Sequence, residues 1–252
     1  MAEFTSYLSY HKFSDSVRTR WRYASDPDQS AFLEVLLATS VPRQEVIASG
    51  SNLWRAQVGY DWYPSSDVSG EEQPAPFGAE RMKPLRDRAR EGRANPKGIP
   101  YLYLATHQDT AMAEVRPWVG SYVSVAQFVL ERDVRVVDCM ASDRRLILYS
   151  REPDPRERER AVWRDIDRGF SQPVTSGDDT ADYVPTQIIA EFFRANGLDG
   201  VGYGSALGEG HNVVLFDLEA ASLVTCGLIE IRGVKFDSAM AANPYSVSRH
   251  ND

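Results

Sequence analysis

The chain has 252 residues, 42% of them hydrophobic and 11% aromatic, which is enough apolar material for a sizeable core. A net charge of −8 argues against a general nucleic-acid-binding protein, because such proteins carry a basic face. Two cysteines are too few for a disulfide framework. There is no signal-peptide pattern and no apolar run near the roughly 20 residues of a membrane span, so we expect a cytoplasmic protein that does not bind a membrane.

The first half of the chain predicts helices followed by one strand and long loops. Residues 1–50 predict a helical N-terminal extension, since Ser25-Asp26-Pro27 is a helix-start signal and apolar residues follow at helical spacing. A second short helix is expected over 42–48 and a first strand over 53–56. Residues 58–80 are rich in Pro, Gly, Ser and acidic residues and predict a long surface loop. Residues 81–98 predict irregular structure.

The second half predicts strands interrupted by helices. Strands are expected over 101–105, 122–130, 134–138, 200–203 and 212–217, with another from about 223, because these runs are rich in β-branched and aromatic residues. A short helix should begin near Asp109 and end before Pro117. Residues 141–196 should be mostly helical, including a helix over 185–195 and a densely charged one over 154–168 with a solvated face. Residues 236–252 should form a flexible tail. This order favours the α+β class.

Two arginines are candidates for binding an anion. Arg55 follows Trp54 on the first predicted strand, and a buried arginine is costly unless it meets an anion. Arg93 lies in a Gly-Arg-Ala-Asn-Pro turn, where glycine lets a ligand approach the backbone. Guanidinium suits phosphate because it can bond two oxygens at once. The alternatives are an edge arginine or an internal salt bridge for Arg55, and a solvated loop charge for Arg93.

Four further residues could complete a ligand site. Strand alternation places Tyr101 and Tyr103 on one face, which would be a cleft or solvent if the intervening leucines are buried. Glu114, in Ala-Met-Ala-Glu-Val-Arg-Pro, has small or apolar neighbours and must be paired, liganded or exposed. Ser205 lies in a glycine-rich turn without a GxSxG motif, which favours hydrogen bonding over nucleophilic attack. Asn212 follows in the next turn. The histidines form no HExxH pattern and no CxxC exists, so no metal is expected.

These stretches together resemble the RES family, named for an arginine, a glutamate and a serine. The matching runs are GRANPKGIPYLYLATHQDTAMAEVRP (92–117) and DGVGYGSALGEGHNVVLF (199–216). In this resemblance the early arginine is Arg55, the second is Arg93 and the strand tyrosine is Tyr103. The helix glutamate is Glu114 and the serine is Ser205, while Asn212 matches a polar position before the closing strand. The resemblance implies a catalytic domain over 51–235.

The resemblance also implies a fold similar to ADP-ribosyltransferases and a bacterial toxin that consumes NAD as substrate. It implies hydrolysis or phosphorolysis, with inorganic phosphate as a co-substrate in the latter case and no prosthetic group. Glu114, Arg93 and Ser205 would be catalytic, and Arg55, Arg93, Tyr103, Ser205 and Asn212 would bind substrate. A small Xre-like antitoxin would cover the cleft.

Two alternatives remain open from the sequence: a protein ADP-ribosyltransferase that uses NAD, and a nucleotide-binding module without turnover. The oligomeric state is also open. Trp21, Trp54, Trp62 and Phe77 are candidates for an apolar surface that binds a partner, either an antitoxin or a second copy of the chain.

Overall fold

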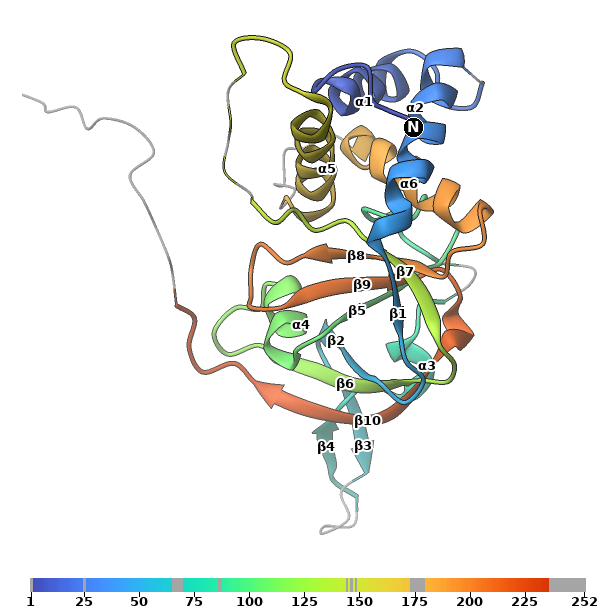
Figure 1. Cartoon of the computed structure of the whole chain (residues 1–252). Coiled ribbons are helices and arrows are strands. Elements are labelled where there is room, and N and C mark those ends of the chain that lie inside the picture. The colour runs from blue at the N-terminus through green and yellow to red at the C-terminus, as the bar shows by residue number, and fades with distance from the viewer. Residues whose placement is uncertain are drawn as a thin grey trace, which may run out of the picture.

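The computed structural model describes residues 2–24, 26–64, 70–85, 88–143, 145, 147, 149–172 and 180–235. These residues form an eight-stranded sheet, a two-stranded hairpin and flanking helices (Figure 1), which confirms the expected α+β class. The α-helices are α1 (Ser9–Thr19), α2 (Pro27–Ser40), α3 (Ala79–Met82), α4 (Gln108–Glu114), α5 (Pro155–Ser171) and α6 (Val184–Ala195). The strands are β1 (Gln44–Ile47), β2 (Asn52–Val58), β3 (Asp61–Pro64), β4 (Glu72–Ala75), β5 (Leu102–Ala105), β6 (Tyr122–Leu130), β7 (Val134–Asp138), β8 (Gly200–Gly204), β9 (His211–Leu215) and β10 (Ala221–Glu230). Among the described helices, none has both the length and the apolar character that a membrane crossing requires.

The large sheet brings together stretches that lie far apart in the sequence. Its strands lie in the order β1-β7-β8-β9-β5-β2-β6-β10, and of these neighbours only β7 and β8 run parallel. Asn212 in β9 lies opposite Tyr203 in β8 and opposite Ala105 in β5. The register therefore places the second glycine-rich stretch directly beside the strand that follows the Arg93 turn.

Four helices cover one face of the sheet. Figure 1 shows α1, α2, α5 and α6 grouped on one side of the strands. Trp163, Phe170 and Phe193 from α5 and α6 are fully buried in a core that also contains Val201 and Val214 from the sheet. Burying a large apolar side chain stabilises a fold by about 1.5–3 kcal/mol, so this layer is a major source of the fold's stability.

The N-terminal extension is part of that same core. Phe13 in α1 stacks on Phe32 in α2 with ring centroids 4.5 Å apart, and both belong to the cluster that contains Trp163. Asp26 caps α2 as expected, accepting a hydrogen bond from the amide of Asp28 at 2.9 Å. The helix expected over 42–48 is wrong, because residues 44–47 form β1 and pair with β7 at the edge of the sheet. Pairing with a distant strand here overrides the local signal.

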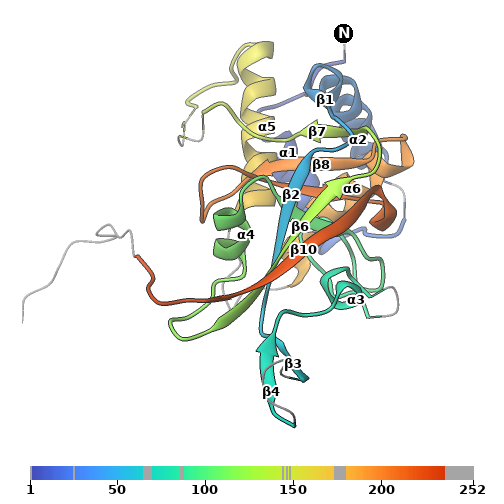
Figure 2. The ribbon, with the colours of Figure 1, turned by 90° about the horizontal axis from the view of Figure 1, so that it is seen from below.

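The loop expected over 58–80 is wrong in part. Strands β3 and β4 pair to form a hairpin that projects from the main sheet (Figure 2), although residues 65–69 lie outside the described part. Trp62 on this hairpin is 56% exposed, whereas Phe77 is 4% exposed. Phe77 therefore does not contribute to an apolar surface; its ring packs under Arg81, 3.7 Å from the guanidinium carbon. The expected tail, 236–252, lies outside the described residues.

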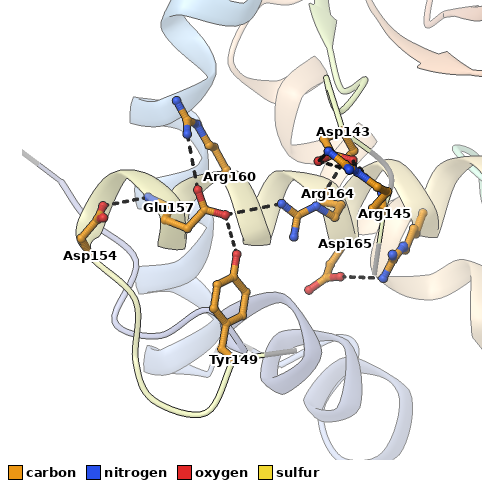
Figure 3. A network of polar contacts seen from close by, with 9 residues as sticks. Asp143, Arg145, Tyr149, Asp154, Glu157, Arg160, Arg164 and Asp165 are labelled. Atoms are coloured by element: carbon orange, nitrogen blue, oxygen red, sulfur yellow. Dashed lines mark hydrogen bonds and ion pairs between the residues drawn. The ribbon is translucent and has the colours of Figure 1, made fainter. Parts of the chain in front are cut away.

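The charged helix α5 is less solvated than its sequence suggests. Its N-terminus is capped by Asp154, and Glu157 accepts a hydrogen bond from Tyr149 at 2.6 Å and pairs with Arg160 at 3.4 Å (Figure 3). Arg164, however, is only 6% exposed and Asp167 is fully buried. The predicted solvated face is therefore limited to the outer side of α5. On its other side, Arg164 and Asp167 are covered by the segment before the helix, where they bond to Asp143 and Ala141.

Candidate functional site

Helix α4 places Glu114 beside the central strands. The helix packs on β2, β5 and β6, and Ala111 on its inner face is 5% exposed. Glu114 is the last residue of the helix and is half-buried. Ser205 Oγ and Asn212 Nδ2 both donate to Glu114 Oε1, each at 2.8 Å. These three residues form one hydrogen-bonded cluster, and within the described part of the chain Glu114 Oε2 accepts no hydrogen bond.

Ser205 is held in place from both sides. It directly follows β8 and is 9% exposed. While its hydroxyl donates to Glu114, its oxygen accepts from the amides of Leu207 at 3.1 Å and Gly208 at 3.2 Å. A serine hydroxyl has one hydrogen to donate and two lone pairs. This arrangement uses all three and suits the positioning of a carboxylate.

Arg93 lies in a turn that Tyr103 holds closed. Tyr103 Oη accepts a hydrogen bond from the amide of Ala94 at 2.9 Å and donates to Asn95 Oδ1 at 2.7 Å. A Cβ atom on Gly92 would lie 2.7 Å from Tyr103 Oη, so a side chain at this position would displace the tyrosine hydroxyl or the turn. From the sequence, we expected Gly92 to let a ligand approach the backbone. In the structure, it makes room for the hydroxyl of Tyr103.

The helical layer fixes the same turn from behind. Gln187 in α6 donates to the carbonyls of Gly92 at 2.9 Å and Asn95 at 3.1 Å. The carbonyl of Phe170, near the end of α5, accepts a hydrogen bond from Arg93 Nη1. The position of Arg93 therefore depends on both α5 and α6. Only one of its N–H groups is used by the carbonyl of Phe170 in this contact, and a guanidinium has further N–H groups that can face a ligand.

Arg55 is a cation that lies in an apolar part of the sheet. Its Nη1 donates to the carbonyl of Tyr103 at 3.0 Å, but its Nε is shielded from solvent and has no hydrogen-bond partner among the described residues. Burial lowers the pKa of Arg55 to about 10, since a charge without a counter-ion is less stable there than in water. A ligand that brings an oxygen to Nε would relieve this cost.

These side chains line a double cavity. The larger lobe, of about 410 Å³, is lined by Gly92, Arg93, Tyr103, Glu114, Arg116, Tyr183 and Tyr203. The smaller lobe, of about 240 Å³, is lined by Trp54, Arg55, Ala56, Tyr103, Leu104, Ala105, Ala111, Glu114, Val115, Tyr203 and Asn212. Tyr103, Glu114 and Tyr203 line both lobes and mark their junction. Burial raises the pKa of both tyrosines, so both rings stay neutral.

The residues singled out from the sequence meet at this double cavity. Glu114 and the strand tyrosine line both lobes, and Ser205 contacts Glu114. The arginines are separated, because Arg55 lines the smaller lobe and Arg93 the larger. A third cavity, of about 460 Å³ between α1 and α2, contains none of these residues. Within the described residues, no group of three or more His, Cys, Asp or Glu side chains could hold a metal ion.

Sequence reasoning missed several lining residues and misplaced one. Tyr101, expected on the cleft face with Tyr103, is 2% exposed and packs on Phe216, because the helical layer covers that end of the strand. Tyr203 was missed, although strand alternation puts it on the same face as Ser205. Arg116 and Tyr183 were also missed, and they lie outside the strands, where no periodicity signals them.

Comparison with known proteins agrees with the arginine, glutamate and serine pattern. The family model described as RES domain matches residues 52–236, which is more than half of the chain. No curated protein matches. One similar solved structure is the crystal structure of the M. tuberculosis MbcT–MbcA toxin–antitoxin complex, with 16% sequence identity, a TM-score of 0.42, and coverage of 77% of this chain and 92% of that chain. By the match to the family model, the chain belongs to the RES domain family.

Proposed function

We propose that the protein cleaves the bond between nicotinamide and ribose in NAD and transfers ADP-ribose to water or inorganic phosphate. The observation that carries this proposal is the position of Glu114 at the junction of the two lobes. In a ligand that fills both lobes, the bond between its two parts would lie beside this carboxylate. Departure of nicotinamide leaves an oxocarbenium-like ribose, and a fixed negative charge stabilises it.

The smaller lobe suits the nicotinamide ring. Its walls include Trp54, Ala56, Ala105 and Val115, which are apolar, and it contains Arg55 with its unpaired Nε. A flat aromatic amide could place its ring against those walls and its carboxamide oxygen on the guanidinium. Nicotinamide is cationic in NAD and neutral once released, so its repulsion from Arg55 disappears as the bond breaks. This difference favours the transition state over the bound substrate.

The larger lobe suits the rest of the dinucleotide. Arg93 lines it and can bond two phosphate oxygens, and the rings of Tyr103 and Tyr203 lie at its boundary with the smaller lobe. A tyrosine ring at this boundary can stack on the nicotinamide as it leaves. In this arrangement the two arginines bind opposite ends of the substrate and do not clamp one group together.

Ser205 and Asn212 orient the carboxylate. Because both donate to Oε1 of Glu114, they fix the plane of the carboxylate and leave Oε2 for the ribose or the acceptor. The carbon–nitrogen bond breaks with its electron pair going to nicotinamide, so no general acid is needed. An oxygen of water or phosphate then bonds to the anomeric carbon, and the proton that water loses can be accepted by Glu114.

Membership in the RES domain family supports a role as the toxin of a toxin–antitoxin pair. An enzyme that consumes cellular NAD would stop growth unless its cleft were covered. The partner we propose is a small protein antitoxin that blocks the double cavity. Induced expression of the wild-type chain in bacteria should lower the NAD content and arrest growth, while the Glu114→Gln variant should do neither.

The test of the chemistry is NAD consumption by the purified protein, with and without inorganic phosphate, with products separated by chromatography. Glutamine at position 114 can still accept hydrogen bonds from Ser205 and Asn212, so Glu114→Gln should fold normally. Loss of the charge should lower the rate by about 10²–10³. Glu131→Gln, at an exposed turn, is the matched control and should keep full activity.

The products separate the remaining possibilities. ADP-ribose would identify water as the acceptor, and ADP-ribose 1″-phosphate would identify inorganic phosphate. Transfer of a tagged ADP-ribose to protein would support a protein ADP-ribosyltransferase instead. NAD binding without release of nicotinamide would leave a binding module. Full NAD turnover by Glu114→Gln would show that the carboxylate has no part in the chemistry.

A further inference from the structure

Arg116 has an unusual backbone for an arginine. It lies two residues after Glu114, just past the end of α4, and its φ is 46°. Among the described residues it is the one non-glycine residue with positive φ; the others in this conformation are glycines such as Gly98 and Gly120. The left-handed conformation is unfavourable for a residue with a side chain, and such outliers concentrate at functional sites. Glycine would form this turn without strain, which points to a use for the side chain.

That side chain lines the larger lobe. Arg116 and Arg93 border the same cavity of about 410 Å³, together with the carboxylate of Glu114. The guanidinium of Arg93 is held from behind by the carbonyl of Phe170, and Oε1 of Glu114 is occupied by Ser205 and Asn212. Two guanidinium groups on the border of one cavity can both donate hydrogen bonds to the oxygens of an anion that enters it.

We propose that Arg116 is a second phosphate-binding residue, which acts with Arg93 on a phosphate oxyanion in the larger lobe. The oxyanion has two sources: the pyrophosphate of the dinucleotide, or inorganic phosphate that enters as the acceptor. This inference rests on the proposed function for the identity of the dinucleotide. The chain places the two arginines on independent segments, the turn before β5 and the end of α4, so a phosphate would join these segments when it binds.

The experiment measures binding, without turnover, by calorimetric titration with ADP-ribose and, separately, with inorganic phosphate. The informative variant is Arg116→Gly, because glycine adopts positive φ freely and removes only the side chain. Its melting temperature, measured alongside, shows whether the variant is folded. Arg116→Lys should recover part of the binding by restoring a charge. Arg151→Gln, at an exposed position outside both lobes, should bind as the wild type does.

We expect Arg116→Gly to weaken one of the two ligands by about tenfold to a hundredfold, as for loss of a charged hydrogen bond. Weaker ADP-ribose binding would identify the pyrophosphate as the source, and weaker phosphate binding would identify the acceptor. Wild-type affinity of Arg116→Gly for both ligands, or a wild-type protein that binds neither, would overturn the inference. Because both titrations measure binding and require no cleavage of NAD, their result does not depend on whether the protein catalyses the proposed reaction. Weaker binding by the variant in a protein that does not cleave NAD would support Arg116 and reject the reaction.

Discussion

Replacement of Arg55 by methionine distinguishes a ligand-binding arginine from a structural one. Methionine keeps the length of the apolar stem and removes the guanidinium. In the folded chain that guanidinium makes one hydrogen bond, from Nη1 to the carbonyl of Tyr103 at 3.0 Å, and its Nε is buried without a partner among the described residues. A side chain placed this way contributes little to the unliganded fold, so its removal should affect binding far more than stability.

The magnitude follows from two opposing effects. Burial lowers the pKa of Arg55 from 12.5 to about 10. At about 1.4 kcal/mol per pH unit, keeping the charge buried costs on the order of 3 kcal/mol at neutral pH, and the variant recovers this. Against it stands the loss of a charged hydrogen bond, worth about 1.5–3 kcal/mol. The two nearly cancel, so we expect a change within about 1 kcal/mol, or a melting temperature within roughly 2–4 °C of the wild type.

Thermal denaturation with and without nicotinamide checks this reasoning. The wild type should be stabilised by nicotinamide, and Arg55→Met should not respond. The matched control is Arg43→Met, because Arg43 donates to the carbonyls of Asp138 at 3.3 Å and Met140 at 3.1 Å and lies over the ring of Trp163. That variant should melt lower and still respond to nicotinamide. A fall of about 3–5 kcal/mol in Arg55→Met, as for a broken structural ion pair, with its nicotinamide response intact, would refute the assignment.

Three further predictions follow from local geometry. Gly92→Ala should displace the turn and lower NAD turnover at least tenfold, since its Cβ would lie 2.7 Å from Tyr103 Oη. The control Gly227→Ala, whose Cβ would have no atom within 4 Å, should keep the wild-type rate, and equal rates for the two variants would contradict the close approach. Tyr103→Phe should lower the free energy of unfolding by about 1–3 kcal/mol because it leaves a buried amide without an acceptor, and an unchanged urea midpoint would contradict this. The hydrogen bond to Asp165 raises the pKa of His11, so the free energy of unfolding that His11→Gln loses should be largest below pH 6.5 and should vanish as the pH rises above the folded-state pKa. A loss that does not change with pH in urea titrations would contradict this.

Local sequence signals predicted strands well where the chain alternates or is rich in β-branched residues. The bounds of β6 and β7 agree with their predictions, because the runs 122–130 and 134–138 are rich in β-branched residues and a polar turn separates them. The signals failed where a distant partner decides the structure. Residues 44–47 form a strand because β7 offers an edge, and residues 61–64 and 72–75 pair with each other despite prolines at positions 64 and 74.

The site was predictable as a set of residues but not as an arrangement. Nothing in the spacing shows that Ser205 and Asn212 would donate to the same oxygen of Glu114, because the contact depends on the pairing of β8 with β9 and on how α4 packs. The placement of Arg55 and Arg93 in different lobes, both of which Tyr103 lines, also depends on tertiary packing. Residue type indicates the chemistry each side chain can perform, and tertiary packing decides which atoms meet.

The helical layer, including the N-terminal extension, supports the cavity from behind. Tyr10 of α1 lies so close to Gly169 of α5 that a Cβ atom there would overlap its hydroxyl. The next residue, Phe170, holds Arg93 through its carbonyl and stacks on Tyr203 with ring centroids 5.4 Å apart. One line of contacts thus runs from α1 through α5 to both lobes. Because interiors are close-packed and transmit strain, we expect a change in the packing of α1 to displace both Arg93 and Tyr203. The extension would then contribute to the geometry of a site that it does not line.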